Sequence, residues 1–301
     1  MKKNAKRRSY LSPYTIAMLV FLIVYAASLL YMYIWGVFTS LKTVDGFKKD
    51  MLWLPKGAPW GWEWKNYTTA FANFQSHDII GSNGFPYRVG FIGMLYNTMI
   101  YSLVQPIIGL SCTWAMAYIC SQFKDMKASK FIFSLNMVLM MIPVVGTMPS
   151  SLQIYKALGL YDTWGWMCMT AIGFVGGNFI IFYAFLRTIA SEMREAAVID
   201  GAGNFTIMLR IIFPLSINMF AILYVTSFIG HWNDYMTMII WLPSKPSLAY
   251  GMYRFQYLTG KDLTWPPIQV AGCVILMLPV LTLFIILKDK ILGGVTIGTL
   301  K

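Results

Sequence analysis

Long apolar runs alternate with short polar segments along this chain of 301 residues. Six of the runs hold close to the ~20 residues that an α-helix needs to cross the ~30 Å hydrocarbon layer of a bilayer. The pattern therefore predicts an all-α fold, that of a polytopic membrane protein with six transmembrane helices. The predicted spans cover residues 15–39, 96–120, 131–149, 166–186, 215–241 and 268–287.

The composition supports a chain that lies mostly in lipid. Hydrophobic residues make up 57% of it and charged residues 12%, whereas soluble domains carry about 25% charged residues. The formal net charge is +12, but the basic residues stand at the ends of apolar runs, as membrane insertion favours. A nucleic-acid binder would gather them on one soluble face. We therefore expect membrane lipid around the chain and no nucleic acid as a partner.

The distribution of basic residues predicts the orientation of the spans. An even number of spans puts both termini on one side, and the segments on that side hold 14 of the 24 lysines and arginines. Five of these precede the first span, whose flank usually dominates. We expect both termini in the cytoplasm. The predicted organisation is a cytoplasmic segment 1–14, a transmembrane domain 15–290 that contains a polar loop at 191–214, and a cytoplasmic tail 291–301.

The polar loop after the fourth predicted span has the residues of a helix-turn-helix. Ser191 can cap a first helix, and Gly201 or Gly203 can supply the left-handed turn at its end. A second helix is expected to begin near Asn204 or Thr206. These residues alone do not distinguish a loop that binds a partner from an ordinary helix-turn-helix at the membrane surface.

The order of residues in the loop resembles the cytoplasmic coupling loop of ABC-importer permease subunits. It reads Glu-Ala-Ala-Val-Ile-Asp-Gly-Ala from Glu195 to Ala202, and Ile-Ile-Phe-Pro follows at 211–214. The Asp-Gly-Ala extension resembles the carbohydrate branch, which includes the maltose inner permease. In this family the loop sits in a groove of the ATP-hydrolysing subunit. The resemblance implies ATPase-coupling roles for Glu195, Ala196, Ala197, Asp200, Gly201 and Ala202, with Phe205 and Leu209 as the apolar docking face.

Other stretches resemble the same family. They are residues 155–163, 230–235 and 294–301, together with Asn97 early in the second predicted span. The resemblance favours a translocation path lined by Asn97, Trp232, Asn233, Asp234 and Tyr235. Because an ionisable group at membrane depth is costly, Asp234 is a functional candidate. The alternative is that Asn233 and Asp234 hold helices together by hydrogen bonds.

Two segments predicted on the outer side are rich in aromatic residues. Residues 242–266 combine tyrosines with arginine, as contact patches do, and in the maltose-type relative the matching loop enters the binding protein. The candidate contact residues are Tyr253, Arg254 and Phe255, and the alternative is packing on the chain's own surface. The tryptophan-rich segment 42–90 fits either the lipid headgroup region or an external partner.

The chain has no residue pattern that indicates an enzyme, a metal site or a cofactor. It has no phosphate-binding Gly-x-x-x-x-Gly-Lys-Ser/Thr stretch, no nucleophile elbow and no His-Glu-x-x-His. Its four cysteines fall inside apolar runs without metal-ligand spacing. We expect no cofactor and no catalytic residue.

The resemblance implies a permease subunit of a bacterial ABC importer for a mono- or oligosaccharide, in the plasma (inner) membrane. The implied partners are a second homologous permease subunit, two ATP-binding subunits and an extracytoplasmic sugar-binding protein. One alternative is a permease for another solute, which the Asp-Gly-Ala and Trp-Asn-Asp stretches argue against. A second is an ion-driven transporter, which would need acidic relays in several spans, whereas Asp234 is the one candidate.

Overall fold

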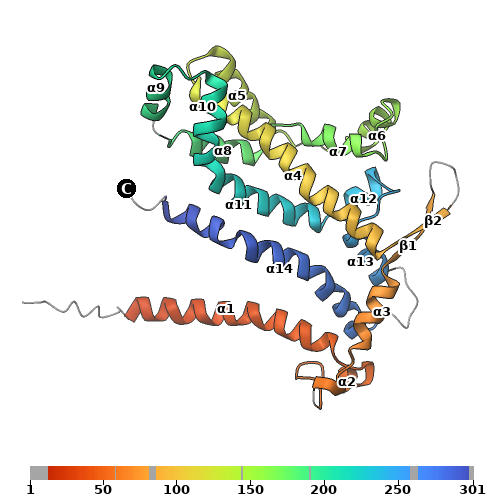
Figure 1. Cartoon of the computed structure of the whole chain (residues 1–301). Helices are drawn as coiled ribbons and strands as arrows, with labels where there is room; N and C mark the ends of the chain where they lie inside the picture. Colours follow the sequence, from red (N-terminus) through yellow and green to blue (C-terminus); the bar gives the residue numbers. More distant parts are fainter. Residues whose placement is uncertain are drawn as a thin grey trace, which may run out of the picture. The chain divides into compact units, whose positions relative to one another are not determined.

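The computed structural model describes residues 13–57, 59–80, 86–143, 145–189, 191–257 and 264–297. Helices dominate these residues, which confirms the predicted all-α class (Figure 1). The chain divides into two compact units, Met1–Asn73 with Thr259–Ile275 and Phe74–Leu258 with Leu276–Lys301. The predicted N-terminal segment up to residue 12 and the last four residues of the predicted tail lie outside the described residues.

The first unit contains one long apolar helix and several short ones. Helix α1 (Pro13–Ser40) confirms the first predicted span, and its side chains are exposed from Pro13 to Ile34, as expected for a helix that faces lipid. It is followed by α2 (Val44–Lys49), the 3₁₀-helix η1 (Pro59–Gly61) and α3 (Lys65–Asn73). The first residues of α14 (Pro266–Ile297) complete the unit.

Hydrogen bonds to backbone carbonyls hold the segment after α1 in place. The amide of Asn66 donates to the carbonyl oxygens of Ser40 at 2.9 Å and Lys42 at 2.8 Å. The Lys42 ammonium donates to the carbonyls of Asp50 at 2.8 Å and Met51 at 3.1 Å. Burial lowers the pKa of Lys42, and the nearby Asp50 carboxylate acts in the opposite direction. Polar contacts therefore hold this segment together, and the apolar side chains of Leu41, Phe47 and Ala70 are buried beside them.

The second unit is built around α4, which contacts α5, α7, α8, α11 and α13. Two antiparallel strands precede α4 and form a small hairpin that the sequence reading did not predict. The elements of the unit are β1 (Gln75–Ile80), β2 (Pro86–Gly90), α4 (Phe91–Gln122), α5 (Lys127–Met141), α6 (Met148–Ala157), α7 (Trp164–Ala171), α8 (Gly177–Leu186), α9 (Ser191–Ile199), α10 (Asn204–Ile207), the π-helix η2 (Met208–Ile212), α11 (Phe213–Trp232), α12 (Met236–Trp241), α13 (Leu248–Tyr257) and most of α14.

The third and fourth predicted spans are not single long helices. The span expected at 131–149 is helical only to Met141, because Pro143 cannot donate a helical hydrogen bond and Gly146 has a φ of +78°. The span expected at 166–186 is interrupted between α7 and α8, where Gly176 has a φ of +140°. Four described helices are long and apolar enough to cross a membrane, namely Pro13–Ser40, Phe91–Gln122, Asn204–Trp232 and Pro266–Ile286.

The fifth predicted span also breaks, after Trp232. Helix α11 ends there and the short α12 begins at Met236, so Asn233, Asp234 and Tyr235 lie in a connection rather than in a helix. Non-helical backbone at membrane depth is tolerated where protein or a watery cavity surrounds it. The fourth and fifth predicted spans of the second unit are therefore interrupted at residues 172–176 and 233–235.

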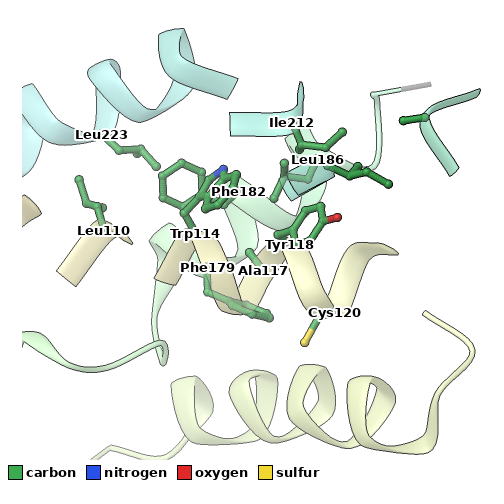
Figure 2. Packing of buried hydrophobic residues seen from close by; sticks show 12 residues of the cluster. Leu110, Trp114, Ala117, Tyr118, Cys120, Phe179, Phe182, Leu186, Ile212 and Leu223 are labelled. Atoms are coloured by element: carbon green, nitrogen blue, oxygen red, sulfur yellow. The ribbon is translucent and has the colours of Figure 1, made fainter. Parts of the chain in front are cut away.

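A single buried cluster packs the C-terminal half of α4 against α8 and α11 (Figure 2). Trp114 of α4 is at its centre: its ring stacks on Tyr118 with centroids 5.8 Å apart, and its Nε1 donates to Ser216 Oγ at 2.9 Å. The members of this cluster, called the α4 core below, are Leu110, Trp114, Ala117, Tyr118, Cys120, Phe179, Phe182, Leu186, Ala197, Ile207, Ile212 and Leu223.

Truncating the α4 core is expected to destabilise the second unit. Trp114→Ala should lower the free energy of unfolding by about 3–5 kcal/mol, because it leaves a large cavity. Ser216→Ala removes one interhelical hydrogen bond and should cost only about 0.6–1.7 kcal/mol. Thermal unfolding of the detergent-solubilised protein measures both. Ile92→Ala, at an exposed position of the same helix, is the control and should cost under about 0.5 kcal/mol. Equal losses for Trp114→Ala and Ile92→Ala would contradict this account of the core.

Candidate functional site

The turn between α9 and α10 has a fixed backbone geometry. Gly201 has a φ of +79°, and its N–H donates to the carbonyl of Val198 at 3.0 Å. The N–H of Ala202 donates to the carbonyl of Ala197 at 2.9 Å. These two bonds form a Schellman motif, which satisfies the last carbonyls of a helix. The predicted left-handed turn is confirmed at Gly201, whereas Gly203 has a φ of −71°.

The second helix of this loop continues into a membrane-spanning helix. Helices α10, η2 and α11 form one helical stretch from Asn204 to Trp232. Its π-turn lies just before Pro214, and there the N–H of Phe213 donates to the carbonyl of Met208, five residues back. Proline lacks an N–H and clashes with the preceding turn of a regular α-helix, and a π-turn is one way to accommodate it. The loop helix and the fifth span are therefore one element, although the sequence reading separated them.

One face of the loop is buried in the α4 core. Ile207 and Ile212 are almost fully buried there, and Ala202 packs against the same cluster. The Ala197 side chain is also a member and is 7% exposed. Its side chain therefore faces the α4 core, which argues against the predicted contact with an ATPase, whereas the neighbouring Ala196 points outward because successive helical residues lie about 100° apart.

The other face of the loop is exposed and partly apolar. Glu195, Ala196, Asp200 and Gly201 are all exposed, as docking requires. Its apolar members are Val198, Ile199, Phe205 and Leu209, of which Ile199 is 86% exposed and Phe205 is 70% exposed. Val198 and Ile199 were not selected from the sequence, although an apolar pair at the end of a polar helix is a usable signal. Below, the exposed face means Glu195, Ala196, Val198, Ile199, Asp200, Gly201, Phe205 and Leu209.

Arg194 joins α9 to the end of α4. Its guanidinium donates to the carbonyl of Gln122 at 3.3 Å and lies 5.2 Å from the ring centroid of Phe123. Lys124 and Arg187 line a hollow of about 460 Å³ beside it. Arg194 therefore positions α9, a role that the sequence motif did not indicate.

Two of the predicted path residues make packing contacts. Trp232 is 2% exposed, stacks on Phe228 with centroids 5.6 Å apart, and donates from Nε1 to the carbonyl of Leu276 at 3.2 Å. Asn97 donates from its amide to the carbonyl of Pro246 at 3.1 Å. Both residues tie chain segments together, so their surroundings favour a structural role.

Asp234 accepts hydrogen bonds on both carboxylate oxygens. Oδ2 accepts from the Tyr101 hydroxyl at 3.1 Å, and Oδ1 accepts from the N–H of Thr237 at 3.0 Å. The second bond satisfies a free N–H at the start of α12. The amide of Asn233, which is exposed, donates to the carbonyl of Ile229 in its own helix at 2.9 Å. These contacts favour the alternative in which Asp234 holds helices together.

The three predicted binding-protein contacts differ in exposure. Phe255 is 1% exposed and stacks on Phe74 with centroids 5.8 Å apart, which argues against its predicted external contact. Tyr253 and Arg254 are half-buried, and Tyr253 stacks on Tyr235 at 4.8 Å. The next ring in this series belongs to Tyr257, which is 65% exposed. Tyr257 is therefore a better candidate for an external contact than Phe255.

Hydrogen bonds and an ion pair join the connection that follows α6 to the connection that follows α12. Asp162, a non-glycine residue with a φ of +59°, accepts from the N–H and the hydroxyl of Ser244 at 3.0 and 2.8 Å. Its carboxylate lies 3.6 Å from the Lys245 ammonium. Burial raises the pKa of the neighbouring Tyr161, and the Asp162 charge adds to this effect.

Residues 115–295 match the family described as binding-protein-dependent transport system inner membrane component. This range covers more than half of the chain and includes α9, α10 and α11. The chain belongs to this family. It is therefore a multi-pass membrane component of a transport system, and we call it the permease below.

Similar proteins cover most or all of the permease. The probable ABC transporter permease protein YurM of Bacillus subtilis is 22% identical over 302 residues, which span 100% of this chain and 93% of YurM. The galactooligosaccharides transport system permease protein GanQ of the same organism is 27% identical over 209 residues, 68% of this chain and 72% of GanQ. A chain of a bacterial ABC transporter for import of the acidic polysaccharide alginate has a TM-score of 0.69, 20% identity, and coverage of 92% and 95%. The permease shares the fold of that chain.

A glycine substitution is expected to loosen the turn of the permease loop. Gly201→Ala places a side chain at positive φ, which costs about 1–2 kcal/mol. Amide hydrogen exchange across 191–203 should therefore accelerate about five- to thirty-fold. Gly203→Ala is the matched control, because φ is ordinary there and nothing lies within 4 Å of an added Cβ at either glycine. Equal exchange in both variants would contradict a turn held by Gly201.

Proposed function

We propose that the permease is the transmembrane subunit of a bacterial ABC importer for carbohydrate. The observation that carries this proposal is the loop α9–α10, which presents one exposed face and buries the other in the α4 core. A polar loop with that arrangement has a surface for a partner and a rigid connection to the spanning helices. Transport is driven by ATP hydrolysis in the partner ATP-binding subunits, since the chain has no phosphate-binding loop of its own.

The sugar class rests on the sequence of the loop and on the relatives. The Asp200-Gly201-Ala202 extension resembles the carbohydrate branch of the family. GanQ is described as a permease for galactooligosaccharides, and the alginate importer has the same fold. Together these findings support a saccharide as the transported solute of this permease.

The proposed complex contains this permease, a second homologous permease, two ATP-binding subunits and an extracytoplasmic sugar-binding protein. Both termini lie in the cytoplasm in this proposal, which puts the loop 191–214 on the side of the ATPases. The transmembrane domain is 15–290, and 291–301 is its cytoplasmic tail. The binding protein then meets the opposite side, where Tyr253, Arg254 and Tyr257 are the contact candidates.

The proposed coupling step is mechanical. Closure of the ATPase dimer moves the exposed face of α9–α10. Because Ile207 and Ile212 are buried with Trp114 and Phe182, the loop can transmit this motion to α4 and α8 without a flexible joint. The continuous helix from Asn204 to Trp232 carries the same motion toward Asn233, Asp234 and Tyr235, the candidate path residues. Packed helices of this kind move as bodies between two arrangements.

Changing the exposed face should uncouple the importer. Glu195→Lys reverses a charge and Ala196→Trp adds bulk, and neither residue is part of the α4 core. We expect insertion of the permease, at least tenfold less co-purified ATPase and a similar loss of uptake of a radiolabelled galactooligosaccharide or maltotriose. Asp125→Lys is the control, because Asp125 is exposed in the turn after α4 and outside the exposed face. Normal ATPase recovery and uptake in both loop variants would refute docking, and a wild-type importer that takes up no saccharide would refute the sugar class.

The hydrogen bonds of Asp234 predict different effects for two substitutions. Asp234→Asn keeps an acceptor oxygen and should leave sugar uptake within about twofold of the wild type. Asp234→Leu removes both acceptors, which are worth about 0.6–1.7 kcal/mol each, and should lower the amount of assembled complex. Blue native electrophoresis and uptake measure the two effects. An Asp234→Asn variant that assembles normally but does not transport would show that the charge acts in the path.

A further inference from the structure

A polar hollow of about 220 Å³ lies within the helical part of the second unit. It is lined by the middle of α4, the end of α7, the break before α8, the start of α8 and the last turns of α11. The break at residues 172–176 interrupts the fourth predicted span, and non-helical backbone within a span needs protein or water around it. Its polar lining side chains are Gln105, Thr113, Thr170, Asn178, Ser227 and His231.

Several of these side chains have hydrogen-bonding capacity to spare. Gln105 Oε1 is buried without a partner among the described residues. Asn178 and Ser227 form no side-chain hydrogen bond within the described part of the chain. His231 Nδ1 lies 2.7 Å from the carbonyl of Ser227, and a carbonyl only accepts, so Nδ1 donates there, while Nε2 has no hydrogen-bond partner in the described part of the chain. The buried Gln105 oxygen in particular requires a partner, and the exposed Asn178 and half-buried Ser227 and His231 side chains are free to supply further hydrogen bonds to the same ligand.

The lining of the hollow contains no carboxylate, lysine or arginine. No Asp, Glu, Lys or Arg is among its twelve lining residues, all of them described. A carboxylate or ammonium that entered it would lose hydration without gaining an opposite charge, which is strongly unfavourable. Sugar hydroxyls both donate and accept, and amides such as those of Gln105 and Asn178 do the same. The chemistry therefore matches an uncharged, hydroxyl-rich solute.

We propose that this hollow is a subsite for one uncharged sugar ring of the transported saccharide. The inference rests on the proposed function and adds two points to it: this permease itself contacts the solute, and the ring bound here is neutral. Gln105, Asn178, Ser227 and His231 bind its hydroxyls. Tyr101 positions His231, because its ring meets the imidazole edge-on with centroids 5.0 Å apart.

A thiol-protection experiment on the complete importer tests the site. The four native cysteines are replaced by alanine, and Ser227→Cys places a thiol of similar size in the lining. Thr226→Cys is the matched control, because Thr226 is adjacent, exposed and outside the lining. The reconstituted complex, with its binding protein, is labelled with a membrane-impermeant thiol reagent in each nucleotide state, with maltotriose, galactotriose or an alginate trisaccharide present.

We expect the neutral trisaccharide that the wild type imports to slow labelling at position 227 at least fivefold and to leave position 226 unchanged. The alginate trisaccharide should protect neither position. Unchanged labelling at 227 in every nucleotide state would overturn the subsite. Protection by the alginate trisaccharide would overturn its neutral character.

A second variant fills the hollow. Gly173 is in the lining, and an added Cβ there has no atom within 4 Å, so Gly173→Leu should occupy the space without a backbone clash. Sugar uptake should fall at least tenfold while ATPase stimulation by the binding protein persists. Gly230→Leu, also in open space but outside the lining, should transport normally.

Normal uptake by Gly173→Leu would refute the subsite alone, whereas a wild type that imports no saccharide would refute the proposed function. If Gly173→Leu fails to assemble, the labelling result at position 227 decides.

Discussion

The permease depends on one physical feature, the burial of its polar loop and three of its helices in a single apolar cluster. Ala197, Ile207 and Ile212 belong to the loop, and they pack with Trp114 and the α8 phenylalanines (Figure 2). A loop held only by its two chain ends would deform when a partner pushed it. Close-packed interiors have low compressibility and transmit strain, so a displacement of the loop moves the core with it.

The same structure shows how a membrane protein accommodates residues that break helices. Pro214 is accommodated by a π-turn, so the helix continues from the loop into the membrane. Helices are interrupted at Gly176 and at residues 233–235, and polar side chains form hydrogen bonds at both breaks. The N–H of Gly176 donates to Asn136 Oδ1 at 2.8 Å, and Asp234 accepts from Tyr101. Interruptions of this kind permit a polar hollow within an apolar bundle.

The sequence pattern predicted the class of the fold better than its details. Length and apolarity identified α1, α4, α11 and α14, because uninterrupted runs leave the helix as the main solution in lipid. The ends and breaks of helices depend on single prolines and glycines, and a hydropathy window averages these out, as at Pro143 and Gly176. The loop motif located the candidate site, but its outward and inward faces depend on helix rotation. Ala197 and Phe255 were therefore chosen for external contacts although both side chains are buried. The hollow around Gln105 and Asn178 depends on the three-dimensional packing of distant segments.

The central claim is that the loop and the spanning helices of this permease move as one body. Electron–electron double resonance between spin labels at Phe205, in the loop helix, and Ile229, near the end of α11, tests it directly in the reconstituted importer. Both side chains are exposed, and a rise of 1.5 Å per residue places them roughly 36 Å apart along the helix. The account predicts the same distance distribution with and without ATP. A shift of the mean distance by more than about one helical turn, ~5 Å, would contradict it.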